Sequence, residues 1–265
     1  MIGLAVPRLT DIVLAQMFEA AQERVRSFGY ETITVSGDEQ DPGHASVHGL
    51  LERRVDGLIL ATANLDAHSL DAFTDIPFIL LNRASGSYPV VRGDDELGGY
   101  LATRHLLEMG HRRIAHLAGP RNVSTSRLRL DGYRRALTEF DVPFDSSLVA
   151  YSEFDTLSAL PAADQLLAKS HPTAMFCVND FVAIAAMSKA RDRGLRLPDD
   201  LAVVGYNDTE VAPLLATPLS TVRMPLQEMG ALAADMIFEL MDGHVPESVV
   251  LQPELIIRAS SSRPS

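Results

Sequence analysis

Residues 172–179 read Pro-Thr-Ala-Met-Phe-Cys-Val-Asn, a short apolar run that ends in a polar amide and leads into a helical stretch. Residues 201–207, Leu-Ala-Val-Val-Gly-Tyr-Asn, have the same form. Continuous apolar runs of this length are typical of strands in parallel sheets that helices cover on both faces. Residues 55–60 and 77–82 repeat the pattern in the first half of the chain. The two halves therefore predict two similar sheets.

Strands and helices alternate from these runs outward to both ends of the chain. The strands are predicted at residues 2–6, 31–35, 56–61, 77–82, 113–118, 147–151, 173–178, 201–206 and about 248–257. The helices are predicted at residues 11–28, 44–53, 67–73, 96–109, 125–140, 157–168, 180–192 and 225–242. This alternation indicates an α/β protein with two similar, doubly wound parallel-sheet lobes.

The chain is predicted to cross between the lobes more than once. The candidate crossings are residues 90–93, 220–223 and 243–246. We predict a first lobe of residues 1–92 plus 224–246, and a second lobe of residues 93–223 plus 247–265. Two lobes joined by several segments suggest a hinged clamp.

The composition excludes several classes of protein. The 265 residues are 46% hydrophobic, which is enough for a buried core and excludes a disordered chain. The formal net charge of −12 repels phosphate, so this chain alone is expected to bind neither nucleic acid nor an anionic membrane. A single cysteine, Cys177, cannot form an internal disulfide and fits a reducing cytoplasm. No apolar run approaches the roughly 18 residues of a membrane span, and the abrupt start in a strand suggests that a segment upstream was removed.

Polar residues follow three of the predicted strands, at positions 82–83, 179–180 and 207–208. In open parallel sheets, ligands bind beyond the carboxyl ends of the strands. For Asp180 and Asp208 two roles stay open, because an aspartate there either caps the next helix or faces a ligand. For the remaining four residues we favour ligand contact, because three such strand ends can converge on one cleft. These four residues are Asn82, Arg83, Asn179 and Asn207.

The helix predicted at 125–140 begins with a second candidate group. Ser124 or Thr125 is expected to cap it, and Thr125 and Arg129 are four residues apart and so share one face. The positive end of the helix dipole and a guanidinium would then face the same space, which suits a polyol or a carboxylate. We expect Arg129 to be partly hydrated, so that its removal weakens ligand binding at least tenfold and barely changes folding stability. Arg134, on the expected solvent face, is the matched control.

Motifs for catalysis, metals and nucleotides are absent from the sequence. There is no G-x-S-x-G elbow, P-loop, H-E-x-x-H or dinucleotide fingerprint, so we expect no enzyme, no catalytic residue and no cofactor. His44 and His48 stand four apart near Asp41, but no third ligand is evident, and we expect no metal site. Cys177 lies inside an apolar strand and is expected to be inert.

Short motifs along the whole chain resemble the effector-binding core of lactose-repressor-type (LacI/GalR) transcription regulators, whose fold is similar to type I periplasmic sugar-binding proteins. The motifs that carry the resemblance are at residues 51–60, 105–115, 119–120, 124–125, 129–133, 172–174, 179–180, 203–208, 218–223 and 253–255. The resemblance implies that a small effector, often a sugar, binds between the two lobes and biases their closure. It also implies a homodimer, supported by the apolar residues Val211, Leu214 and Leu215 beyond a strand end. Operator DNA would be bound only through an N-terminal helix-turn-helix headpiece that this chain does not contain.

The resemblance also implies which residues bind the effector. Phe154 matches an aromatic residue that packs on the ligand, and Val13 and Leu14 match positions of the first helix that line the cleft. The complete set of implied ligand-binding residues is Val13, Leu14, Arg83, Asp94, Thr125, Arg129, Phe154, Asn179 and Asn207.

Two departures from the family pattern bear on the identity of the effector. Residues 11–14 are Asp-Ile-Val-Leu where members often have Asn-Pro and two aromatics, so one wall of the site is aliphatic. Asn207 stands where the family often has Asp, and an amide both donates and accepts hydrogen bonds. The alternative function is a free-standing sugar-binding protein for transport or chemosensing, which an upstream signal peptide would identify.

Overall fold

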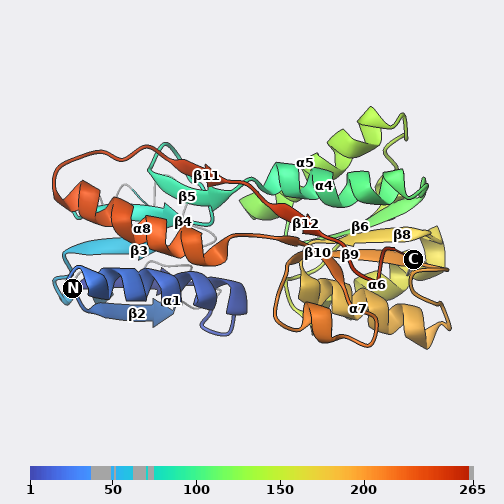
Figure 1. Cartoon of the computed structure of the whole chain (residues 1–265), viewed down its shortest axis with the longest axis horizontal. Coiled ribbons are helices and arrows are strands. Elements are labelled where there is room, and N and C mark those ends of the chain that lie inside the picture. The colour runs from blue at the N-terminus through green and yellow to red at the C-terminus, as the bar shows by residue number, and fades with distance from the viewer. Residues whose placement is uncertain (37–48, 51, 62–69, 71–74, 263–265) are drawn as a thin grey trace. The chain divides into compact units, whose positions relative to one another are not determined.

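The computed structural model describes residues 1–36, 49–50, 52–61, 70 and 75–262. The chain forms two compact units, one of Met1–Gly93 with Pro225–Leu251 and one of Asp94–Met224 with Gln252–Ser265. Each unit contains its own six-stranded sheet (Figure 1). The predicted helices at 44–53 and 67–73 lie largely outside the described residues, as do His44 and His48.

The first unit has an entirely parallel sheet in the order β11-β5-β4-β3-β1-β2. Its strands are β1 (Ile2–Val6), β2 (Thr32–Ser36), β3 (Gly57–Leu60), β4 (Phe78–Leu81), β5 (Val90–Gly93) and β11 (Val249–Leu251). Its long helices are α1 (Ile12–Ser27) and α8 (Leu226–Met241), which pack on each other. Asp11 caps α1 by accepting hydrogen bonds from the backbone N–H groups of Val13 and Leu14, at 3.0 and 3.3 Å.

The second unit repeats this strand order, as β12-β10-β9-β8-β6-β7. Its strands are β6 (Ile114–Ala118), β7 (Val149–Tyr151), β8 (Ala174–Cys177), β9 (Ala202–Asn207), β10 (Ser220–Arg223) and β12 (Glu254–Ile256), of which only β12 is antiparallel to its neighbour. Its helices are α4 (Asp95–Glu108), α5 (Ser124–Glu139), α6 (Thr156–Ser170) and α7 (Asp180–Asp192), with short 3₁₀ turns at Ser146–Leu148 and Ala212–Leu214. The predicted fold class, two α/β lobes with mostly parallel sheets, is confirmed.

The core of the second unit has two layers, one on each face of its sheet. Met175 and Cys177 of β8 lie in an apolar cluster with residues of α6 and α7. Alternate residues face the other side, where His116 of β6 stacks between Phe176 of β8 and Tyr133 of α5. This explains why β8 is apolar along its whole length.

The chain passes between the units directly after residues 90–93 and close after residues 220–223, as predicted, but the third predicted crossing, at 243–246, is wrong, because the chain stays in the first unit as far as Leu251. Residues 90–93 and 220–223 are also strands, β5 and β10, which the sequence did not predict. The single strand predicted at about 248–257 is two strands in different sheets, β11 and β12, with Gln252-Pro253 between them. Because β11 pairs with β5, residues 247–251 belong to the first unit and not to the second. Among the described residues, no helix has the length and apolar character that a membrane crossing requires.

Candidate functional site

The carboxyl edge of the second sheet is the natural place for a ligand. Strands β6 and β8 are neighbours, yet the chain leaves β6 toward β7 on one side and β8 toward β9 on the other. At such a switch point the connections diverge and leave a crevice beyond the strand ends. The residues that follow β6 and β8 are Gly119 and Val178, and the start of α5 lies shortly beyond Gly119.

Close packing of α4 on α5 builds one wall of this edge. A Cβ atom on Gly99 would collide with the carbonyl oxygen of Arg129, and one on Gly132 would collide with that of Glu96. A Cβ atom on Gly98 would likewise collide with the Tyr206 hydroxyl. Gly99 and Gly132 therefore serve the packing of α4 on α5, and Gly98 serves the packing of α4 on Tyr206 of β9, roles that the sequence alone did not reveal.

Arg129 is held by the protein itself, contrary to the prediction that it is partly hydrated. Its Nε donates to Oδ1 of Asp95 at 2.8 Å, and its Nη2 lies 2.8 Å from the same oxygen. Its Nη1 donates to the carbonyl oxygen of Val178 at 2.6 Å, and the guanidinium carbon lies 3.6 Å from the centre of the Tyr206 ring. Arg129 is only 6% exposed and Asp95 only 2%. The pair is thus an internal ion pair that links α4, α5 and the end of β8.

Tyr206 supports this ion pair from β9. Burial, and after it the negative charge of Asp95, hold the pKa of the Tyr206 phenol well above its ordinary value, while Arg129 opposes this shift. The hydroxyl donates to Sδ of Met224 at 3.4 Å. The ring is therefore a neutral surface on which the guanidinium stacks.

The start of α5 is uncapped, contrary to the predicted cap at Ser124 or Thr125. The N-cap residue is Val123, which has no side-chain hydrogen-bond acceptor. Thr125 and Ser126 lie buried in the first turn, and Oγ of Ser126 has no partner among the described residues. The first N–H groups of this helix and two hydroxyls are thus donors placed at the same edge.

Phe154 lies against this helix start, at the carboxyl end of the neighbouring β7. A Cβ atom on Gly119 would lie 2.5 Å from Oγ of Ser126 and 2.7 Å from the Phe154 ring, so only glycine lets these groups approach. Asn179 fixes the loop by donating from Nδ2 to the carbonyl oxygen of Phe154 at 2.8 Å. The edge therefore combines an aromatic ring with hydrogen-bond donors.

Asn179 and Asp180 make hydrogen bonds within the protein that the sequence did not predict. Asn179 is the N-cap of α7, because its Oδ1 accepts from the N–H of Val182 at 2.8 Å. Asp180 is fully buried, and it accepts hydrogen bonds from Thr221 Oγ1 at 2.6 Å and from the N–H and Oγ1 of Thr209 at 2.7 and 2.9 Å. Burial raises the pKa of Asp180 to about 6, and these bonds partly offset that rise. Asp180 thus ties α7 to β10 and to the chain after β9.

Asn207 and Asp208 end β9 in a backbone conformation that is unusual for residues other than glycine. Their φ angles are +97° and +53°. Asp208 is held by ion pairs with Arg223 at 2.8 Å and Arg258 at 2.7 Å, so its alternative role as a helix cap is not observed. The Asn207 amide makes no hydrogen bond to the residues that the structure describes. Strained residues of this kind concentrate at ligand sites, which favours Asn207 as a ligand contact.

The remaining predicted residues belong to both units. Asp94 is the N-cap of α4 and accepts from the N–H of Leu97 at 3.0 Å. In the first unit, Arg83 follows β4 and is half-buried, and Val13 is half-buried on α1. Leu14 belongs to the buried stripe of α1. The part of the chain that the structure describes holds no group of three side chains suited to a metal ion.

Comparison with known proteins agrees with this arrangement. Residues 103–261 match the model of the periplasmic binding protein-like domain. The HTH-type transcriptional regulator DegA of Bacillus subtilis is 33% identical over 99% of this chain and 81% of its own length. The solved complex of the transcriptional regulator CelR with cellobiose has a TM-score of 0.91 at 29% identity, covering 98% of this chain and 84% of that one. The lac repressor dimer bound to operator and an anti-inducer has a TM-score of 0.91 at 29% identity, covering 98% and 93%.

Proposed function

Because the chain belongs to the LacI family of transcription regulators, we propose that it is the effector-binding and dimerisation core of such a regulator. The observation that carries this proposal is the carboxyl edge of the second sheet, where the uncapped start of α5, the Phe154 ring and the strained Asn207 lie beyond strands β6, β7 and β9. The relatives that match almost the whole chain are regulators, which favours this function over transport and over catalysis.

The proposed effector is a sugar or a related polyol. Hydroxyl groups can accept from the first N–H groups of α5 and both donate to and accept from Thr125 and Asn207. The apolar face of a sugar ring can stack on Phe154. The related regulator CelR was solved with cellobiose, a ligand of this class. Val13, Leu14 and Arg83 of the first unit remain proposed contributors to effector binding.

Effector binding would act on DNA through thermodynamic linkage. A ligand that favours one state of the core changes the operator affinity of an attached helix-turn-helix headpiece, and DNA changes the effector affinity by the same factor. Direct contact between this core and DNA is not part of the proposal, because its net charge is −12. The test has two parts. The upstream coding sequence is examined for a helix-turn-helix, and the operator affinity of the polypeptide that it encodes together with this chain is measured with and without the effector.

A thermal-shift screen followed by calorimetry tests the effector site. Sugars, polyols, nucleosides and small acids are screened, since a ligand selective for the folded state raises the melting temperature. Phe154→Ala should then weaken binding of the selected compound at least tenfold, which corresponds to about 1.4 kcal/mol. Arg134→Ala, on an exposed part of α5, should bind like the parent. A panel without any stabilising compound, or equal affinity in Phe154→Ala, would contradict the proposal.

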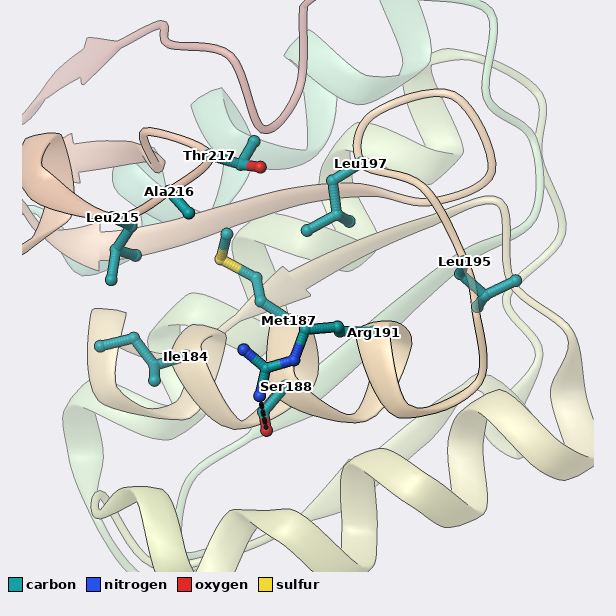
Figure 2. Close-up of a pocket in the computed structure, with 9 residues that line it drawn as sticks. All are labelled: Ile184, Met187, Ser188, Arg191, Leu195, Leu197, Leu215, Ala216 and Thr217. Carbon is teal, nitrogen blue, oxygen red and sulfur yellow. Dashed lines mark hydrogen bonds between the residues drawn. The ribbon is translucent and has the colours of Figure 1, made fainter.

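We further propose that the second unit carries the contact surface of a homodimer. Figure 2 shows a hollow between α7 and two loops, with Met187 of α7 extending toward the loop that carries Ala216. Its volume is about 340 Å³, and Leu195, Leu197 and Leu215 contribute to its mostly apolar wall. Leu214 is 81% exposed beside it. The lac repressor, which is similar over nearly the whole chain, was solved as a dimer, which supports a second copy as the occupant.

Light scattering tests the dimer. The parent chain should have the mass of a dimer at micromolar concentration, and Leu214→Glu should have the mass of a monomer while its circular dichroism stays unchanged. Val245→Glu is the control, because Val245 is also exposed but lies in the first unit. A parent chain that stays monomeric at high micromolar concentration would overturn this part of the proposal.

A further inference from the structure

The positive charge of Arg129 is already neutralised inside the second unit. Two of its nitrogens lie 2.8 Å from one carboxylate oxygen of Asp95, and both residues are almost fully buried. Buried ion pairs are screened little by solvent, so the two charges act together as a dipole and not as a free cation. The guanidinium can still donate hydrogen bonds from its remaining N–H groups.

Further negative charge adjoins this pair. Asp94 precedes Asp95 at the start of α4, and its negative charge contributes to the raised pKa of the Tyr206 phenol, on whose ring Arg129 stacks. The third contact of the guanidinium is the Val178 carbonyl oxygen, a neutral acceptor. Among the described residues, the Arg129 cation is therefore accompanied by two carboxylates at the start of α4, those of Asp94 and Asp95.

This charge balance discriminates between ligands. A carboxylate or phosphate that approached Arg129 would gain little attraction, because Asp95 compensates the charge of the guanidinium, and Asp94 would repel it. Because Asp95 and Arg129 neutralise each other, the net charge left beside the site is that of Asp94, and the roughly half positive charge at the start of α5 does not offset it. A neutral hydroxyl needs only donors and acceptors, and these are present at Thr125 and at the first turn of α5.

We propose that Asp95 is a specificity-determining residue, which makes the effector site accept uncharged hydroxylated ligands and reject carboxylates and phosphates of the same size. The location of the site rests on the proposed function above. The role of Asp95 rests on its ion pair with Arg129. The sequence left open whether the ligand is a polyol or a carboxylate, and this role favours the polyol.

The test substitutes Asp95→Asn, which keeps an oxygen for Arg129 and removes the charge. Inorganic phosphate is the probe, titrated by calorimetry against chloride at constant ionic strength, with circular dichroism as the check of folding. The parent should show no saturable phosphate binding over the titrated range. Asp95→Asn should bind phosphate at least about tenfold more tightly than the weakest affinity that the titration of the parent could have detected. Asp131→Asn is the matched control. It removes the carboxylate that lies 3.2 Å from Arg134 on α5, and this ion pair is exposed. This variant should behave like the parent.

Each outcome decides the proposal. Phosphate binding to the parent with an affinity like that of Asp95→Asn would overturn it, and so would a folded Asp95→Asn that binds no phosphate. The double variant Asp95→Asn/Arg129→Met should lose the gained binding, which assigns it to Arg129.

A second measurement does not depend on how Asp95→Asn folds. The parent is screened with pairs of aldoses and the uronates of the same ring, and a uronate that stabilises the parent as much as its aldose refutes charge selection. That result would leave effector binding intact. If no sugar stabilises the parent but Asp95→Asn gains phosphate binding, the sugar effector is refuted. The proposed role of Asp95 is then still supported.

Discussion

Replacing Arg129 by alanine removes the guanidinium that joins α4, α5 and the end of β8. Asp95, which is 2% exposed, would lose its two 2.8 Å contacts with Arg129 and remain as a buried carboxylate without this cation. Breaking a buried pair from one side costs about 3–5 kcal/mol. The lost stacking on Tyr206 and the lost hydrogen bond to the Val178 carbonyl oxygen would lower the stability further. We therefore expect Arg129→Ala to lower the free energy of unfolding of the second unit by about 4 kcal/mol.

Urea unfolding followed by circular dichroism measures this loss. Arg134→Ala is the control, because its partner Asp131 is exposed and surface ion pairs contribute little. The double variant Asp95→Asn/Arg129→Met should be less destabilised than the sum of its single variants, because no unpaired charge stays buried. A loss below about 1 kcal/mol in Arg129→Ala would refute the internal ion pair, since that is within the range of a solvated surface pair.

Three further substitutions test other features of the fold and site. Gly99→Ala should destabilise the second unit by about 2 kcal/mol in urea unfolding, because its Cβ would push α5 away, whereas Gly49→Ala should leave the stability of the first unit unchanged, because its Cβ would meet no described atom within 4 Å. Asn207→Gly should raise the melting temperature by relieving about 1 kcal/mol of strain and weaken effector binding in calorimetry; unchanged binding would remove Asn207 from the site. Burial lowers the pKa of His116 from 6.5 to about 4, so the unfolded chain takes up the proton first and stability is lost as pH falls from 6.5 to 4. His116→Phe should remove up to about 3 kcal/mol of this pH dependence, and an unchanged urea midpoint profile over that range would contradict the assignment.

Most strands and helices of the described residues are predictable from the sequence within a few residues. Burial of a strand on both faces leaves a continuous apolar run, and burial of a helix on one face leaves a periodic stripe, and both are local patterns. Strands β5 and β10 were not predicted, because they lack such a local apolar pattern. Each is four residues long and contains an arginine, Arg92 or Arg223, so neither reads as an apolar run. They are strands because a neighbouring strand supplies their hydrogen bonds.

The candidate site was predictable in its place but not in its roles. The strand ends at Asn179 and Asn207 are visible in the sequence, and so is the start of α5. Asp95 was missed, because nothing near it in sequence indicates a partner 34 residues away. The one local signal is glycine at Gly99 and Gly132, which marks two helices that approach closely. That signal has meaning only once the two helices are known to pack together.

By itself, the sequence determined that two parallel α/β sheets form and that polar residues follow their strands, because both properties repeat over a few residues of chain. Only the tertiary structure decided which of those polar groups the fold engages. Asn179 and Arg129 are bound by partners on other elements, whereas the amide of Asn207 is left available. A hydrogen bond between distant residues depends on the three-dimensional approach of whole helices and strands, and no local spacing encodes that approach.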